Sequence, residues 1–200
     1  MSIKFQYNKT SLQSLEKQLK VRVRALPTLK NKESALRVEV RKSKDESKRL
    51  DSELNKIVES YDNMVALWCE FDTSLIKITD VKLGIKKIAG VKTPILESIE
   101  FDKVEFSIFN MPKWYISGVA ILKEMVEIAI SREVFEKKMQ LLEYGRKKTT
   151  QKVNLFEKVQ IPGYEDAVRK IKRFMEDEDN LSKSSQKIVK NKQQQEEAVL

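Results

Sequence analysis

A heptad pattern runs without a slip from Leu12 to Ile78. An apolar residue returns after three and then four positions, and sixteen of the twenty positions in the series are apolar. A heptad held this long keeps one seam of a helix against one partner helix, and the pair then supercoils left-handedly. At the rise of an α-helix, the segment is expected to form a rod of about 100 Å. A rod of this kind needs a partner along its length.

A second heptad pattern in the C-terminal half supplies that partner. A helix is predicted to begin near Pro112 and Trp114, because apolar residues then recur in heptad phase. After Pro162 and Gly163 the seam resumes in a shifted phase, which predicts a kink at this pair. The apolar positions of this half are Ile121, Met125, Ile128, Phe135, Met139, Leu142, Val153, Phe156, Tyr164, Val168, Ile171 and Met175.

The segment between the two helices has the period of a β-strand. Apolar Val81, Leu83 and Ile85 alternate with other residues, and a similar alternation follows in Val104–Ile108, with Gly90 and Pro94 expected to break the stretch between them. We therefore predict a mainly α protein, a long antiparallel two-helix coiled-coil hairpin with a small head that contains a β-hairpin. The expected segments are the first helix in 1–79, the head in 80–111, the second helix in 112–190 and a frayed polar tail in 191–200, all in one structural unit.

Two details of the first helix follow from its residues. Asn8 and Thr10 are both suitable N-caps, so the helix is expected to begin near them. Pro27 lies inside the pattern and removes one backbone hydrogen bond, which predicts a local kink or a restart of the helix. The apolar register agrees on both sides of Pro27, so the helix direction is expected to continue.

The composition argues against catalysis. The chain has no histidine and a single cysteine, Cys69, so the commonest acid–base group is missing and neither a disulfide nor a zinc cluster can form within one chain. No glycine-rich phosphate loop is present. No catalytic residue, metal site or cofactor is expected. The chain also lacks an apolar run long enough to span a membrane and an export signal at its N-terminus.

The positive charge is concentrated in the first quarter of the chain. The net charge is +9, and the first fifty residues hold fourteen lysines and arginines against five acidic residues. Such a concentration attracts an anionic partner, although a solvated helix flank is an equally good interpretation. Arg22 and Glu33 differ from the rest because they occupy seam positions. Arg22 must either extend to solvent or meet a carboxylate of the partner helix, and Glu33 poses the same problem.

An aromatic cluster is expected near the head. Tyr61, Met64, Trp68 and Phe71 continue the heptad there. They are more often core residues than a cofactor site, and they would stiffen the pair or support a second protein.

Several segments resemble the D subunit of the V-type/A-type rotary ATPases. Arg24–Leu36 is similar to the basic segment of that family, and Val81–Pro94 is similar to its short hairpin region. The most specific likeness is near the C-terminus, where Thr150–Glu157 resembles the family's Arg-Val-Asn-Ala-Leu-Glu block and Ile161-Pro162 its Ile-Pro dipeptide. The residues carried over from these motifs are Val153, Asn154, Glu157, Ile161, Pro162 and Glu165. The sequence departs from the family at Ala25, Pro27, Phe156 and Gly163-Tyr164, which suggests a divergent bacterial member.

The resemblance implies a non-catalytic central-stalk rotor that links ATP hydrolysis or synthesis to translocation of protons or sodium ions. The implied partners are the catalytic and regulatory A and B subunits, the F subunit of the stalk and the C/d socket subunit of the membrane ring. The chain would be a peripheral subunit on the cytoplasmic side of a bacterial plasma membrane, with no direct membrane insertion and no nucleic acid. We expect a cationic collar, defined as the residues that face acidic loops of the hexamer: Arg22, Arg24, Lys30, Lys32, Arg169, Lys170, Lys172 and Arg173. Candidate contacts to the stalk and socket subunits are Tyr61, Trp68, Val81, Leu83 and Ile85.

Two other classes of protein are compatible with the residues. A basic helical hairpin that binds nucleic acid would also use a charge of +9, and its affinity would fall steeply with salt. A structural coiled-coil tether would have no enzyme partner. The strands between the helices argue mildly against the tether.

Overall fold

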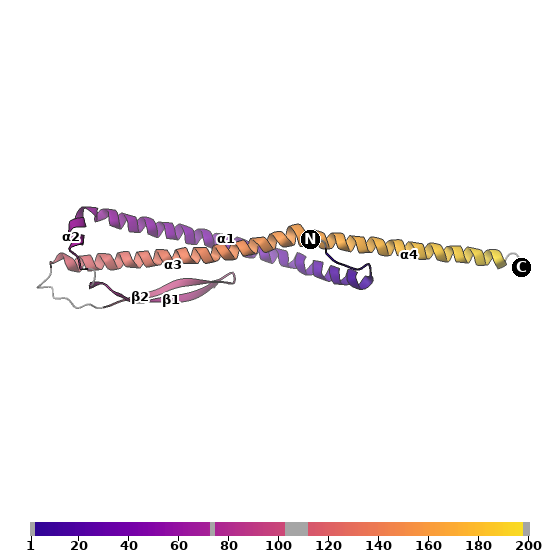
Figure 1. The fold of residues 1–200 in the computed structure, drawn as a ribbon, viewed down its shortest axis with the longest axis horizontal. Coiled ribbons are helices and arrows are strands. Elements are labelled where there is room, and N and C mark those ends of the chain that lie inside the picture. Colours follow the sequence, from indigo (N-terminus) through magenta and orange to yellow (C-terminus); the bar gives the residue numbers. More distant parts are fainter. Residues whose placement is uncertain (1–2, 73–74, 103–111, 198–200) are drawn as a thin grey trace. The chain divides into compact units, whose positions relative to one another are not determined.

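The computed structural model describes residues 3–72, 75–102 and 112–197. The protein is mainly helical, with two long helical segments packed against each other and a two-stranded antiparallel hairpin between them in sequence, which confirms the predicted fold class (Figure 1). The elements are α1 (Lys9–Ser60), a 3₁₀ turn (Asp62–Met64), α2 (Val65–Cys69), β1 (Ile78–Ile88), β2 (Val91–Phe101), α3 (Trp114–Leu155), a π-helical turn (Phe156–Gln160) and α4 (Ile161–Glu197).

The chain divides into two compact units. We call Met1–Asn31 with Thr149–Leu200 the terminal unit and Lys32–Lys148 the central unit. The helix α1 contributes to both, as does α3. The expected division into 1–79, 80–111, 112–190 and 191–200 stays a prediction about stretches of sequence.

The first helix begins where the sequence predicts. The Oδ1 atom of Asn8 accepts a hydrogen bond from the backbone N–H of Ser11 at 2.6 Å, which satisfies one of the free donors of the first turn. The helix passes through Pro27 without interruption.

The first helix ends earlier than its heptad pattern predicts. It stops at Ser60 instead of continuing to Ile78, which is the first residue of β1. The hydroxyl of Ser60 donates to the carbonyl of Ile57, and the N–H of Tyr61 bonds to the carbonyl of Val58, three residues back. These bonds replace the regular helical pattern at this point.

The predicted seam is the buried face of α1. Its buried residues are Leu15, Glu33, Leu36, Ser43 and Leu50, and all five are heptad positions. In the terminal unit, Leu15 packs with four buried residues of α4, and Leu12, Leu19 and Met175 lie against this core. The four residues of α4 are Tyr164, Ala167, Val168 and Ile171. In the central unit, α3 buries Val134 and Leu142.

A π-helical turn accounts for the shift in phase of the second helix. The sequence predicted a kink at Pro162 and Gly163, and the structure places the irregularity directly before them, at Phe156–Gln160. A π turn adds about one residue to the helical repeat. From Val153, a regular heptad leads to Gly163, whereas the buried residue is Tyr164. The one-residue shift in the sequence therefore has a direct structural cause.

The helix α4 extends into the predicted tail. It continues to Glu197, and residues 176–195 are exposed. Within the part of the chain that the structure describes, no helix is long and apolar enough to cross a lipid bilayer.

The hairpin joins the strands through a two-residue turn. Ala89 and Gly90 have φ angles of 47° and 81°, as a tight turn with both residues in the left-handed region requires. Pro94 does not break the stretch as predicted, because it lies within β2, opposite Ile85. A proline is tolerated there since each strand of a two-stranded sheet is an edge strand. The strand expected at Val104–Ile108 lies outside the described residues.

Candidate interaction surfaces

Arg22 connects the two helices of the terminal unit. Its Nε atom donates to Oε1 of Gln160 at 2.8 Å, and its guanidinium carbon lies 4.3 Å from the centre of the Tyr164 ring. The sequence predicted either exposure to solvent or a carboxylate partner. That prediction was wrong about the partner, because the guanidinium group contacts the amide of Gln160 and the aromatic face of Tyr164.

Four other residues of the cationic collar form ion pairs within the terminal unit. Lys30 pairs with Glu157 at 2.7 Å and Lys172 with Glu16 at 2.8 Å, so both pairs join α1 to the returning chain. Asp166 contacts both remaining cations, Lys170 at 2.9 Å and Arg169 at 3.8 Å. The hydrogen bond from Lys172 lowers the pKa of Glu16, and the one from Lys170 lowers the pKa of Asp166. These contacts reduce the charge that the collar presents to a partner.

The other collar residues belong to both units. Arg24 and Arg173 are exposed residues of the terminal unit. Arg24 lies with Lys17 and Lys20 along one groove of α1. Lys32 belongs to the central unit, where its Nζ atom lies near Gly90 of the hairpin turn.

The residues of the C-terminal motif surround the π-helical turn. Val153 is buried before the turn, and Glu157 within it binds Lys30. Ile161 and Pro162 are the first two residues of α4. Asn154 and Glu165 are exposed. The motif therefore coincides with the place where the seam changes phase.

A polar layer links α1 to α3 in the central unit. The side chain of Glu33 is 12% exposed, and it lies 2.9 Å from Arg37 and 3.8 Å from Arg146. Arg146 also binds Glu143 at 2.6 Å, and this hydrogen bond lowers the pKa of Glu143. A partly buried charged group at a seam position disfavours other registers of the helices, in which it would lose its partner.

The predicted aromatic residues form part of a larger cluster in the central unit. Trp68 contacts Tyr61, Phe71 and Trp114, with ring centres 6.1, 5.7 and 5.6 Å away. The hydroxyl of Tyr115 donates to the carbonyl of Glu70 at 2.6 Å. The contribution of Trp114 and Tyr115 to this cluster was not predicted, although the predicted helix start near Pro112 places these two aromatic residues in its first turn.

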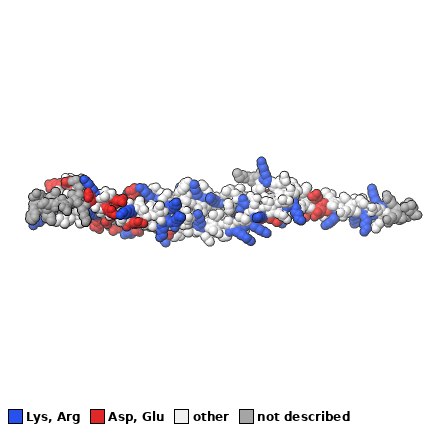
Figure 2. Space-filling view, turned by 90° about the horizontal axis from the view of Figure 1, so that it is seen from below, with Lys and Arg blue, Asp and Glu red and all other residues white. Residues whose placement is uncertain are grey.

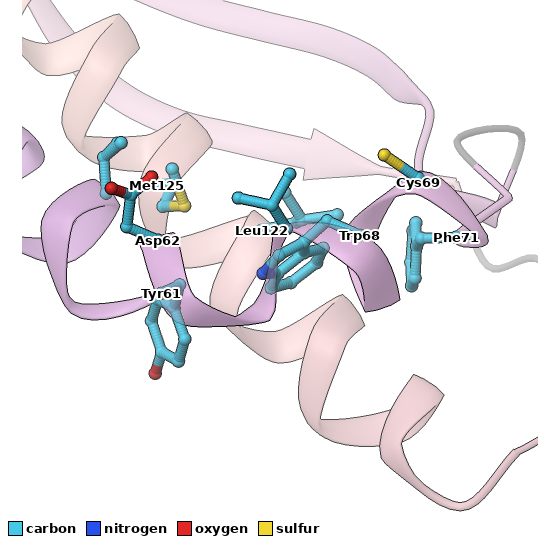
Figure 3. Close-up of a pocket in the computed structure, with 9 residues that line it drawn as sticks. Tyr61, Asp62, Trp68, Cys69, Phe71, Leu122 and Met125 are labelled. Atoms are coloured by element: carbon cyan, nitrogen blue, oxygen red, sulfur yellow. The ribbon is translucent and has the colours of Figure 1, made fainter.

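A pocket of about 410 Å³ adjoins this cluster. Its lining side chains come from two segments, residues 58–71 and α3, which contributes Leu122 and Met125 (Figure 3). Asp62 is the charged residue among the side chains that line it. The pocket is thus mostly apolar and open to solvent.

The hairpin packs on α3 and leaves apolar side chains exposed. A Cβ atom at Gly145 would lie 2.6 Å from Cγ2 of Val91, so only glycine permits this close approach. Leu83 and Ile85 are 52% and 74% exposed, whereas Val81 is half-buried. Leu83 and Ile85 line a different cavity from Tyr61 and Trp68, so the predicted stalk contacts form two separate surfaces.

Comparison with known proteins identifies the family. The family model described as the D subunit of ATP synthase matches residues 11–191. The chain belongs to this family. It is 32% identical to the V-type ATP synthase D subunit of Borreliella burgdorferi over 191 residues, which cover 94% of each chain. It is 28% identical to the protein of the same name from Chlamydia muridarum over 98% of each chain, and 30% identical to that from Chlamydia felis over 85% of this chain and 84% of the relative.

Family membership confirms the resemblance seen in the sequence. The match begins in the first turns of α1 and ends within α4. It therefore includes both units, the hairpin, the aromatic cluster and the π-helical turn of this member of the D-subunit family.

Proposed function

We propose that this chain is the central stalk of a V-type ATP synthase and carries torque between the catalytic hexamer and the membrane ring. The match to the ATP synthase D-subunit family over residues 11–191 is the observation that carries this proposal. The chain is proposed to be non-catalytic and to bind the A and B subunits of the hexamer, the F subunit of the stalk and the C/d socket subunit. Its proposed place is the cytoplasmic side of a bacterial plasma membrane, as a peripheral subunit.

The packing of the helices suits a part that transmits torque. The apolar seam holds the pair together, and polar contacts cross it in both units. Gln160 binds Arg22 in the terminal unit, and Asp51 binds Arg132 at 2.7 Å in the central unit. Directional contacts of this kind oppose sliding and rotation of one helix against the other, which an apolar seam alone resists less specifically. Rotor angle and nucleotide state would then be coupled through the differing contacts that the stalk makes with each catalytic interface.

The cationic collar is proposed to attract acidic loops of the hexamer without locking the rotor. Exposed ion pairs contribute only about 0–1 kcal/mol each, so contacts of this type can be exchanged as the stalk turns. Arg24 and Arg173 are the most informative members, because both are exposed and both belong to the terminal unit.

Charge reversal tests the collar and the function together. The double variant Arg24→Glu/Arg173→Glu is expected to bind the complex of A and B subunits about tenfold more weakly at low salt, with a smaller difference at high salt. The matched control is Lys48→Glu/Lys56→Glu, which reverses two exposed charges of the central unit. Retention of the chain on the immobilised A–B complex and ATP hydrolysis by that complex are measured. Equal binding of both variants would reject the collar, and failure of the wild-type chain to bind would reject the stalk.

The contacts of the basic residues do not favour the nucleic-acid alternative. Lys30, Lys170 and Lys172 are bound to carboxylates of the same chain. The phosphates of a nucleic acid would have to displace these carboxylates before they could bind the same lysines.

A further inference from the structure

The pocket beside the aromatic cluster lies in an acidic part of a basic protein. Residues 57–76, which lie between Lys56 and Lys77, contain Glu59, Asp62, Glu70 and Asp72 but no lysine or arginine, although the chain as a whole has a charge of +9. All four carboxylate residues are exposed. Figure 2 shows several acidic side chains, with basic ones among them, toward the end of the central unit that holds α2. The local field at the pocket therefore favours a cation.

The walls of the pocket also suit a cation with an apolar stem. Val58, Val65, Leu122 and Met125 provide aliphatic surface, and Trp68 provides an aromatic wall (Figure 3). Aromatic faces attract ammonium and guanidinium groups, most strongly when a carboxylate is close by. Asp62 is the carboxylate that lines this pocket.

The neighbouring helix does not neutralise this site. Between Trp114 and Ser131, α3 carries Lys123 as its basic residue, together with Glu124 and Glu127. The Nζ atom of Lys123 lies 5.5 Å from the centre of the Phe101 ring, on the hairpin. Glu124 and Glu127 outnumber Lys123, so this stretch of α3 keeps a net negative charge.

We propose that this pocket receives a lysine or arginine side chain of a partner protein, presented next to aliphatic residues. The charge of the site and its apolar walls select this occupant over an uncharged apolar helix or an acidic segment. The inference rests on the proposed function only in that a stalk has a partner at this surface, and it specifies the chemistry that the partner must present.

The two tryptophans make the site directly observable. The chain contains two tryptophans, Trp68 and Trp114, and their ring centres lie 5.6 Å apart in this cluster. Intrinsic fluorescence of the full chain therefore reports on this site. The probes are three acetylated and amidated pentapeptides, Ala-Leu-Lys-Leu-Ala and its analogues with glutamine or glutamate at the centre.

The lysine peptide is expected to bind about two- to fivefold more tightly than the glutamine peptide, and the glutamate peptide most weakly. The Asp62→Asn variant is expected to lose this preference, and Asp179→Asn, an equal charge change at an exposed position of α4, is expected to keep it. Added salt should reduce the preference of the wild-type chain for the lysine peptide over the glutamine peptide, and this test does not depend on any variant.

Two results would overturn the proposal. Equal binding of the lysine and glutamine peptides would show a site with apolar selectivity only. No fluorescence change with the lysine peptide up to its solubility limit would show that the pocket does not bind such a group. The titration uses the isolated chain and a site in the central unit, so its outcome is separate from that of the assembly test with Arg24 and Arg173.

Discussion

At the scale of single residues, the polar members of the seam determine how the helices meet. Arg22 and Glu33 were singled out in the sequence because they interrupt an apolar series. Glu33 meets a cation of the other helix, Arg146, whereas Arg22 meets Gln160 and Tyr164. The partner of Arg22 could not be inferred from heptad phase, because the π-helical turn changes which residues of the returning helix face α1.

Gly145 gives a sharp test of how the hairpin is held on α3. Gly145→Ala raises helix propensity by about 1 kcal/mol but places a methyl group against Val91. We expect faster amide hydrogen exchange in β1 and β2, measured by mass spectrometry, because the hairpin must move away from α3. Adding Val91→Ala should restore protection, since it removes the methyl group that clashes. If the amides of β1 and β2 exchange as slowly in Gly145→Ala as in the wild type, the close approach of Val91 to Gly145 does not hold the hairpin on α3.

At the scale of elements, periodicity predicts which face is buried better than it predicts where an element ends. The heptad phase continues past Ser60 into Phe71 and Leu75, and both are buried. The chain nevertheless leaves the helix at Ser60, and Trp114 and Tyr115 of α3 complete the core around Phe71 and Leu75. That contact joins distant parts of the sequence, so a local pattern could not reveal it. The packing of Val91 on Gly145 was missed for the same reason.

The π-helical turn makes a prediction about chain length. Deleting Val159, which is exposed, would bring Tyr164 into heptad phase with Val153 in a regular α-helix. Pro162 would then lie inside that helix and oppose it by about 3 kcal/mol. We therefore expect the deletion with Pro162→Ala to be more stable than the deletion alone by about this amount, measured by urea unfolding followed by circular dichroism.

The control deletes Lys152 in the same Pro162→Ala background. This deletion rotates Val153 by about 100° relative to the preceding helix and leaves the π-helical turn in place. It should be much less stable than the Val159 deletion. Equal stability of the two deletions would mean that the phase shift is not corrected at the turn.

At the scale of the whole molecule, the sequence was sufficient for the fold class and the family, and insufficient for the contact surfaces. Two long heptad series with few glycines and prolines predict two long helices that pack against each other, so the architecture follows from the local sequence pattern. The collar was predicted from charge and from the resemblance to the family, and neither shows which cations are already bound within the chain. Lys30 and Lys172 are examples, since their carboxylates come from distant segments.

If the chain is a torque-carrying stalk, weakening its core should uncouple the motor before it prevents assembly. Ile171 is fully buried in the terminal unit, and Ile171→Ala is expected to lower the free energy of unfolding by about 2–5 kcal/mol. In the assembled complex in proteoliposomes, we expect ATP hydrolysis to continue while fewer ions are pumped per ATP, because a less rigid pair yields under load. Leu181→Ala removes an apolar side chain that is 71% exposed on α4, and it should leave both the stability and the pumping ratio unchanged. An unchanged ratio in the destabilised Ile171→Ala complex would mean that torque does not depend on this part of the core.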